Sequence, residues 1–222
     1  MSEDKLELVT LLGSFGDDLM VANCARVSMK KRHILFDPVG DTRLIKYLAK
    51  HKHWSPFAHP HIQLRIEAPI FVARQWFRHT VGTIRSEVSR RYVDDEPSCY
   101  TPKSWRSRPE KNIKQGSGGE LDENAQDSAH KIAMGAHIEA ATAYYELLEL
   151  GVSPEMARMV LPQSMMTQWV ETGSLYYWAN FCRQRLDSHA QAEIRGYAEE
   201  VSEIANKLFP VSWKTLMDVN HE

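Results

Sequence analysis

Hydrophobic positions along the chain repeat with two different periods, which predict strands in some segments and helices in others. Apolar and polar residues alternate in 5–15 and in 61–69, where Ile62, Leu64 and Ile66 share one side. This period of two predicts a strand in each segment, and 164–173 also has an extended pattern. These strands predict a modest mixed or antiparallel sheet.

A helical period and suitable end signals predict several helices between and after these strands. Apolar residues recur at helical spacing after Ser188, and Leu44, Ile45 and Leu48 share one face of a helix that Asp41 caps. Asp17 and Asp18 give another helix an acidic first turn. The predicted helical segments are 19–29, 42–52, a helix that starts at Pro69 and reaches His79, 124–150 closed by Gly151, 154–161 after a Ser153 cap, 174–185 and 189–209.

The resulting fold class is α+β, a modest sheet flanked by several helices of which one is long. At 222 residues the chain fits a single domain spanning 1–222, with a polar, Gly-rich and mobile surface loop over 101–125.

The composition of the chain argues against several classes of function and leaves the predicted fold class unchanged. A formal charge of −2 gives no global field for nucleic acid, so an anion site has to be a local arginine cluster. Three scattered cysteines without CxxC spacing argue against a disulfide framework and suit a reducing cytoplasm. The start of the chain lacks a signal-peptide pattern, and no run of about 20 apolar residues predicts a membrane span.

Residues 73–92 concentrate arginines beside Trp76 and Phe77, a pattern that predicts a partly apolar anion as ligand. On a helix, Gln75, Arg78 and His79 lie near one face. In an extended segment, Glu87, Ser89 and Arg91 project to one side, where carboxylate, hydroxyl and guanidinium can bind a nucleotide. A salt-bridged surface strand is the alternative, and a nucleic-acid-binding module over 74–91 is opposed by the net charge.

Two further clusters carry candidate chemistry. Four histidines in 51–61 suggest a metal-dependent hydrolase, a turn with surface histidines, or a loop over a planar ligand that uses His53 and Ser55. Arg185, Asp187 and His189 lie around the start of the last long helix, where anions are favoured. Adjacent residues there cannot form a Ser/His/Asp triad, so Ser188 is interpreted as a helix cap.

Five motifs in order resemble the flavin-dependent thymidylate synthase family. They are "NCARVS", "HKHWSPFAH", "ARQWFRHT" with "SEVSRRY", "ARMVLP" and "RLDSHAQAEI". The family signature has Arg-His-Arg, seven residues and Ser; this chain has Thr80 in place of the second arginine and eight residues before Ser89. Ala58 also stands where many members have glutamate, so the chain resembles a variant branch.

The resemblance implies that the chain converts dUMP to dTMP with FAD as cofactor. NADPH and methylenetetrahydrofolate are the implied co-substrates, and no cysteine nucleophile is implied. Neither nucleic acid nor a membrane is implied as a partner. A homotetramer with flavin sites shared between chains is implied as the assembly.

The resemblance also assigns site residues by position. Arg185 is the implied catalytic residue, at the uracil ring, where its charge can stabilise negative charge on the base. The implied dUMP-binding residues are Gln75, Glu87, Ser89, Arg91, Arg158 and Arg185. The implied FAD-binding residues are Ser28, His53, Ser55, Arg78, His79, Asn180 and His189, and no metal ligand is implied.

Overall fold

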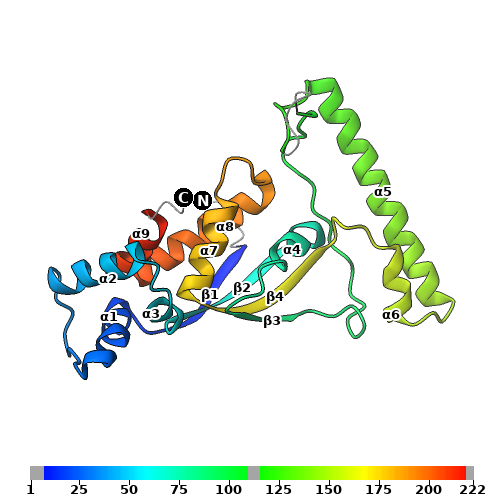
Figure 1. Cartoon of the computed structure of the whole chain (residues 1–222). Coiled ribbons are helices and arrows are strands. Elements are labelled where there is room, and N and C mark those ends of the chain that lie inside the picture. The colour runs from blue at the N-terminus through cyan, green and yellow to red at the C-terminus, as the bar shows by residue number, and fades with distance from the viewer. Residues whose placement is uncertain (1–7, 110–115, 219–222) are drawn as a thin grey trace, which may run out of the picture. The chain divides into compact units, whose positions relative to one another are not determined.

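A computed structural model describes residues 8–109 and 116–218 of the chain, which form two compact units (Figure 1). The first unit comprises 1–66, 79–86 and 170–222, and the second comprises 67–78 and 87–169. Strands β2 and β4 each run from one unit into the other. The prediction of one domain over 1–222 stays a prediction.

The first unit contains strands at its centre and helices from both ends of the chain. Its elements are β1 (Val9–Phe15), α1 (Asp18–Arg26), η1 (Val27–Met29), α2 (Gly40–Lys50), α3 (Ser55–Ala58), most of β2 (His61–Pro69), most of β3 (Thr83–Glu87), the second half of β4 (Met166–Ser174), α7 (Leu175–Arg185), α8 (Ala192–Leu208) and α9 (Pro210–Asp218). The strand order is β1-β2-β4-β3, and β1 pairs with β2 in antiparallel register. The α+β class and the sheet are therefore confirmed.

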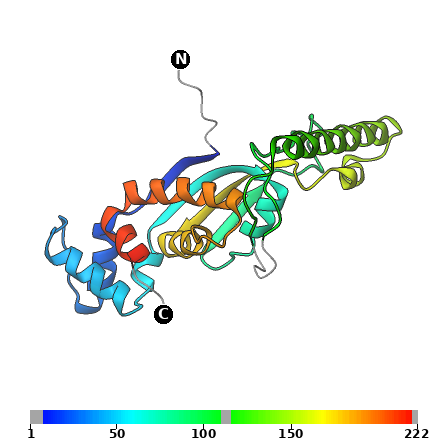
Figure 2. The same ribbon diagram turned by 90° about the horizontal axis from the view of Figure 1, so that it is seen from above.

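The core of the first unit forms where the alternating side of β2 meets the apolar faces of the last helices. Ile62, Leu64 and Ile66 are completely buried, as their spacing predicts. Helix α7 packs on α8, which in turn packs on β1, and Figure 2 shows α8 lying along the strands. Trp178 of α7 also donates its indole N–H to the carbonyl of Ile62 at 3.2 Å.

Helix ends in the first unit differ from the sequence predictions at two caps. Asp41 lies inside the first turn of α2, fully buried, where it accepts hydrogen bonds from the Arg26 guanidinium and from the N–H of Asp37. Burial alone would raise the pKa of this carboxyl, but Arg26 and the Asp37 N–H hold it below its usual value. The prediction that Asp41 caps the helix is wrong because its carboxylate serves Arg26 instead.

The second wrong cap is Ser188, because α8 starts only at Ala192. Residues 187–190 form a turn in which the N–H of Ala190 donates to the carbonyl of Asp187 at 2.9 Å. Asp17, by contrast, caps α1 by accepting from the N–H of Met20 at 2.8 Å, and the helix over 19–29 is confirmed except that its last turn is 3-10.

Helix α9 was not predicted, and its start is capped from the other end of the chain. The buried carboxylate of Asp18 accepts from the N–H groups of Val211 and Ser212, each at 2.8 Å. These bonds satisfy first-turn donors that a helix leaves open.

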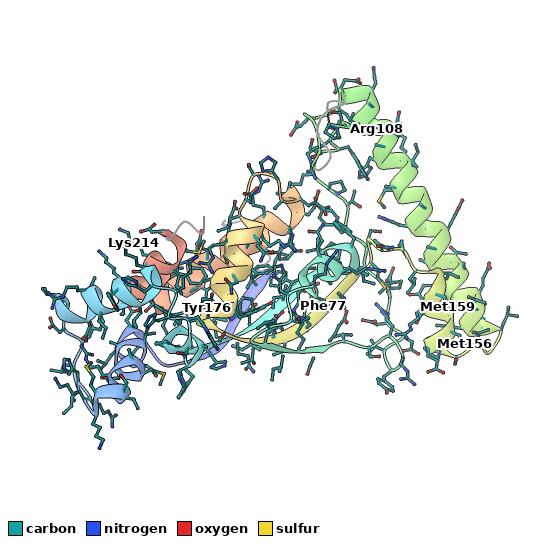
Figure 3. The ribbon with its side chains drawn as sticks, viewed as in Figure 1. Phe77, Arg108, Met156, Met159, Tyr176 and Lys214 are labelled. Atoms are coloured by element: carbon teal, nitrogen blue, oxygen red, sulfur yellow. The ribbon has the colours of Figure 1, made fainter. Side chains whose placement is uncertain are left out.

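The second unit is built around a long helix and an aromatic cluster. Its elements are the end of β2, α4 (Ile70–Trp76), the long α5 (Glu123–Glu149), α6 (Pro154–Ala157), η2 (Arg158–Val160) and the first half of β4. The ring of Trp169 packs edge-on against Trp76, with centroids 5.2 Å apart, and against Phe77, with centroids 5.1 Å apart. Phe77 is labelled in Figure 3. Such edge-on packing of aromatic rings anchors the end of α4 on β4.

Predicted boundaries in the second unit hold for α5 and fail after α4. Asp122 caps α5 and Gly151 follows it with φ +84°, so the long helix is confirmed. Helix α4 ends at Trp76, so the prediction that it reaches His79, with Gln75, Arg78 and His79 on one helix face, is wrong.

The polar segment before α5 is more organised than the sequence suggests. In its described parts, the backbones of Arg106 and Glu120 form an isolated antiparallel β-bridge, and the Gln126 side chain bonds to the backbone of Trp105. Residues 110–115 of the predicted mobile loop lie outside the described residues. Within the ranges 8–109 and 116–218, no helix combines the length and apolar character required to cross a membrane.

Candidate functional site

His79 and Arg185 meet in the first unit, where the end of α7 approaches the segment before β3. The Nε–H of Arg185 donates to Nε2 of His79 at 3.0 Å, and the His79 ring packs edge-on against Phe181. Because a guanidinium can only donate, Nε2 of His79 is the acceptor and its ring proton lies on Nδ1. Two residues that are distant in sequence and both predicted as site residues are therefore in contact.

The environment of His79 keeps its imidazole neutral. Burial, together with the positive charges of Arg185 and Arg85, lowers the pKa of His79 to about 4, although Glu171 acts in the opposite direction. At neutral pH, the ring is thus a hydrogen-bonding group for Arg185 and carries no charge of its own.

Arg85, Glu171, Tyr177 and Thr83 form a network that the sequence analysis did not identify. Glu171 is fully buried and accepts from Arg85 at 3.0 Å, from Thr83 at 2.7 Å and from the Tyr177 hydroxyl. A signal was present in the sequence, since the alternation of β4 places Glu171 on the same buried side as Trp169. An acidic residue at such a position requires partners.

Part of the predicted flavin set gathers around an aromatic pocket of the first unit. This pocket is lined by His53, Trp54, Tyr176 and Arg183. Tyr176 projects from α7 (Figure 3), and its ring centroid lies 6.1 Å from that of Trp54. Ser55 follows Trp54 at the start of α3.

Arg183 connects this pocket to another predicted flavin residue. Its guanidinium donates to the side-chain oxygen of Asn180 and to the carbonyl of Leu216, and burial lowers its pKa. Ring faces beside a half-buried guanidinium are the residue types that suit a planar ligand with anionic groups, whereas the cavity between them encloses only about 10 Å³ and would have to open to admit a flavin.

Ser28 lies in the 3-10 helix η1 and His189 in a turn, and both are exposed in the first unit. The Ser28 hydroxyl donates to the carbonyl of Ala25 at 3.0 Å, and the His189 ring is 2.9 Å from the Asp187 carboxylate. The N–H and ring of His189 lower the pKa of Asp187. Their hydrogen bonds are local, and their roles stay predictions.

In the second unit, predicted nucleotide residues gather around Glu155. The Nε–H of Arg91 donates to Oε2 of Glu155 at 3.0 Å, and Nη2 of Arg91 lies 3.0 Å from the same oxygen. Arg158 donates from Nε to the backbone carbonyl of Glu155 at 3.2 Å. Ser89 accepts from the N–H of Arg91 at 3.3 Å. The Glu155 carboxylate thus occupies the guanidinium of Arg91, a group that also suits a phosphate.

The Ser89 segment is a turn, so the predicted extended alternation is wrong beyond β3. The N–H of Tyr92 donates to the carbonyl of Ser89 at 3.0 Å. Glu87 ends the strand and accepts from the Thr167 hydroxyl at 2.8 Å. Ser89 and Arg91 are therefore in contact because they share a turn, and not because they lie on the same side of a strand.

The remaining two residues of the second unit frame the end of α4. Gln75 is half-buried within the helix and Arg78 is exposed just after it. Thr80 lacks the guanidinium of the family signature. Arg74, Arg85 and Arg90 are the arginines that could substitute for it; Arg74 is exposed in α4, Arg85 pairs with Glu171, and Arg90 pairs with Asp95 at 2.6 Å.

The three thiols are poor nucleophiles in this structure. Burial raises the pKa of Cys24, Cys99 and Cys182, and Cys182 is completely buried. A thiol is reactive as its thiolate, which these environments disfavour. The cysteines therefore offer no activated nucleophile.

The histidine cluster of 51–61 forms ring contacts. His51 and His53 lie with centroids 6.4 Å apart, and both pack near Tyr47. Across the described ranges, no group of three or more His, Cys, Asp or Glu side chains is arranged to hold a metal ion.

Comparisons with known proteins agree on one family. A family model described as thymidylate synthase complementing protein matches residues 10–211. The chain is 38% identical over 205 residues to a flavin-dependent thymidylate synthase of Thermus thermophilus, covering 92% of this chain and 73% of that protein. It is 37% identical over 219 residues to one of Thermosipho melanesiensis, covering 97% of this chain and 91% of that protein.

A solved structure is similar over almost the whole chain. It is a UMP/dUMP methylase, PolB from Streptomyces cacaoi, bound with 5-Br dUMP, with a TM-score of 0.83, 29% identity and 93% of each chain covered. These matches give no support to the alternative of a metal-dependent hydrolase.

Proposed function

The chain belongs to the thymidylate synthase complementing protein family, and from that premise we propose that it is a flavin-dependent thymidylate synthase that methylates dUMP. The observation that carries the proposal is the contact between Arg185 and His79, and the same unit also contains an aromatic and cationic pocket. Curated relatives with this activity in their names match nine-tenths of the chain, and a UMP/dUMP methylase shares its fold.

The flavin is assigned to residues of the first unit, and Arg78 belongs to the flavin set by resemblance alone. His53 supplies a ring for stacking, Ser55 and Asn180 supply hydrogen-bonding groups, and Arg183 supplies positive charge beside the pocket. His79, Ser28 and His189 complete the set on the basis of the resemblance. Methylenetetrahydrofolate donates a methylene carbon to dUMP, and bound FAD, once reduced by NADPH, would supply the hydride that converts this carbon to a methyl group.

By resemblance, the nucleotide is assigned to Gln75, Glu87, Ser89, Arg91, Arg158 and Arg185, of which Ser89, Arg91 and Arg158 lie together in the second unit. The Arg91–Glu155 pair is half-exposed on both sides, so it contributes only about 0–1 kcal/mol to stability. A nucleotide phosphate can replace Glu155 at little cost and receive a charge-assisted bond. Arg185 orients the pyrimidine and stabilises negative charge that develops on it.

The absorption spectrum of the purified protein tests the cofactor assignment. We expect a yellow protein whose flavin absorbance is bleached by NADPH, and formation of dTMP when dUMP and methylenetetrahydrofolate are added. A colourless protein that does not take up FAD would refute the function. Stoichiometric zinc or manganese, with activity lost to a chelator, would instead indicate the hydrolase.

His53→Ala tests the aromatic pocket. Loss of the imidazole removes a stacking face of the pocket, so flavin or folate affinity should fall about tenfold, in line with the roughly 1–3 kcal/mol of a ring–base stack. Fluorescence titration of the apoprotein with FAD and the KM for methylenetetrahydrofolate measure this. His51→Ala is the control, because His51 does not line the pocket; equal behaviour of the two variants would contradict the assignment.

The proposed assembly is a homotetramer, supported by apolar side chains of the second unit. Only Tyr144 of the 27-residue α5 is buried, whereas Ile132 and Ile138 are 74% and 62% exposed. Met156 and Met159, labelled in Figure 3, are also exposed near η2. Exposed apolar side chains on neighbouring elements, here α5, α6 and η2, are typical of protein interfaces.

Sedimentation measures the assembly directly. We expect a mass four times the 25.5 kDa of the chain, and a shift to smaller species when Ile132 and Ile138 are both replaced by lysine. A wild-type protein that sediments as a monomer at micromolar concentration would rule out the tetramer.

A further inference from the structure

The Glu171 network places one guanidinium between a buried carboxylate and the backbone of His79. Nη2 of Arg85 lies 3.0 Å from Glu171 and 3.1 Å from the Tyr177 hydroxyl, and it also donates to the carbonyl of His79. The side chain of Glu171 is completely buried and that of Arg85 is 15% exposed. A buried charge pair with this many hydrogen bonds has little freedom to move.

The ring of His79 transmits this restraint to Arg185. Its carbonyl is held by Arg85, while its Nε2 accepts from Arg185 and its ring rests on Phe181. The contacts therefore run without a break from Glu171 in β4, through Arg85 in β3 and His79, to Arg185 at the end of α7. The charged groups that face His79 along this path are Arg185, Arg85 and Glu171.

Arg85 is thus not an obvious replacement for the guanidinium that Thr80 lacks. A ligand phosphate would have to compete with Glu171, Tyr177 and a backbone carbonyl for its donors. A guanidinium fork suits several fixed acceptors at once, which an ammonium group cannot match. Its contacts point to support of the neighbouring main chain.

We propose that Arg85, anchored by Glu171, is a positioning residue that fixes the His79 backbone and thereby orients the Arg185 guanidinium toward the pyrimidine. The expected effect on kcat for dTMP formation rests on the proposed function. The expected effect of Arg85 on the positions of His79 and Arg185 does not. Misplacement of a catalytic group by about 1 Å can cost roughly 100-fold in rate. Arg85 therefore acts on turnover through two other residues.

Arg85→Lys is the decisive variant, because it keeps the charge and removes the fork. We expect kcat for dTMP formation to fall about 10- to 100-fold, with the rate of flavin reduction by NADPH and the KM for dUMP close to wild type. A second readout needs no activity. In ¹⁵N NMR spectra, wild-type His79 should be a neutral imidazole with its proton on Nδ1, and the variant should show a mixture of tautomers.

The control is Arg26→Lys, since Arg26 is also a buried arginine that faces a fully buried carboxylate, Asp41, in the same unit. It should lower the melting temperature in a similar way and leave the His79 spectrum unchanged. If Arg85→Lys does not fold, Glu171→Gln, which keeps shape and an acceptor, provides the same comparison with a smaller effect.

The two proposals fail in different ways. A wild-type protein that binds flavin and forms no dTMP would defeat the proposed function, while the tautomer comparison would still test the role of Arg85. An Arg85→Lys protein with the wild-type His79 spectrum and wild-type kcat would overturn the positioning role. An equal spectral change in Arg26→Lys would overturn it as well.

Discussion

Replacing Arg185 with alanine should abolish nearly all dTMP formation and leave FAD bound. The guanidinium is assigned to the pyrimidine, and removal of one donor that stabilises a developing charge costs about 10²- to 10³-fold in kcat. The flavin residues around His53 and Asn180 remain in place, so the visible spectrum of the holoprotein should be unchanged. Single-turnover formation of dTMP, measured beside the flavin absorbance, checks both expectations.

The same variant has a predicted effect on His79. Its pKa is held at about 4 by burial and by the charges of Arg185 and Arg85, so loss of Arg185 should raise it toward the ordinary value of 6.5. NMR titration of the imidazole measures this shift. Arg43→Ala, which removes an exposed arginine of α2, is the control and should change neither turnover nor the titration. Loss of flavin from Arg185→Ala with dUMP affinity intact would contradict the assignment.

Glu171→Ala should produce the largest loss of stability among the changes considered. It leaves Arg85 as a buried cation without its carboxylate and removes the acceptor of Thr83 and Tyr177. Breaking a buried pair from one side costs about 3–5 kcal/mol. For a chain of this length, such a loss lowers the melting temperature by about 6–20 °C.

Urea unfolding of the apoprotein, followed by tryptophan fluorescence, gives the free energy of unfolding. Thr172→Val is the matched control, because Thr172 follows Glu171 in β4 and its hydroxyl makes only an exposed contact with Gln63. Its cost should be below about 0.5 kcal/mol, as is usual for surface substitutions. A Glu171→Ala protein as stable as this control would show that the network adds nothing to stability.

Local sequence patterns predicted the elements well wherever one residue type determines a turn or an end. The alternation of Ile62, Leu64 and Ile66 located β2, and Gly151 located the end of α5, because these signals act over a few neighbouring positions. Asp41 and Ser188 were wrongly predicted as caps, because a carboxylate or hydroxyl near a helix start can serve a distant partner or a turn instead.

The candidate site was predictable by resemblance and only partly by physics. Arg185 and His79 meet through folding of segments more than a hundred positions apart, which periodicity alone does not reveal. Glu171 and Glu155 were missed for a similar reason, since each gains its meaning from an arginine elsewhere in the chain. The arginines stand out in the sequence because they cluster, whereas the acids that pair with them lie singly in other segments.

The bonds from Asp18 to the start of α9 also bear on how the protein is made. They join positions 193 and 194 residues apart, so they cannot form until the ribosome has released almost the entire polypeptide. Most of the second unit comes from the uninterrupted stretch 87–169, which emerges earlier. During synthesis we therefore expect the first unit to finish folding after the second, because Asp18 can bond to Val211 and Ser212 only once these residues have left the ribosome.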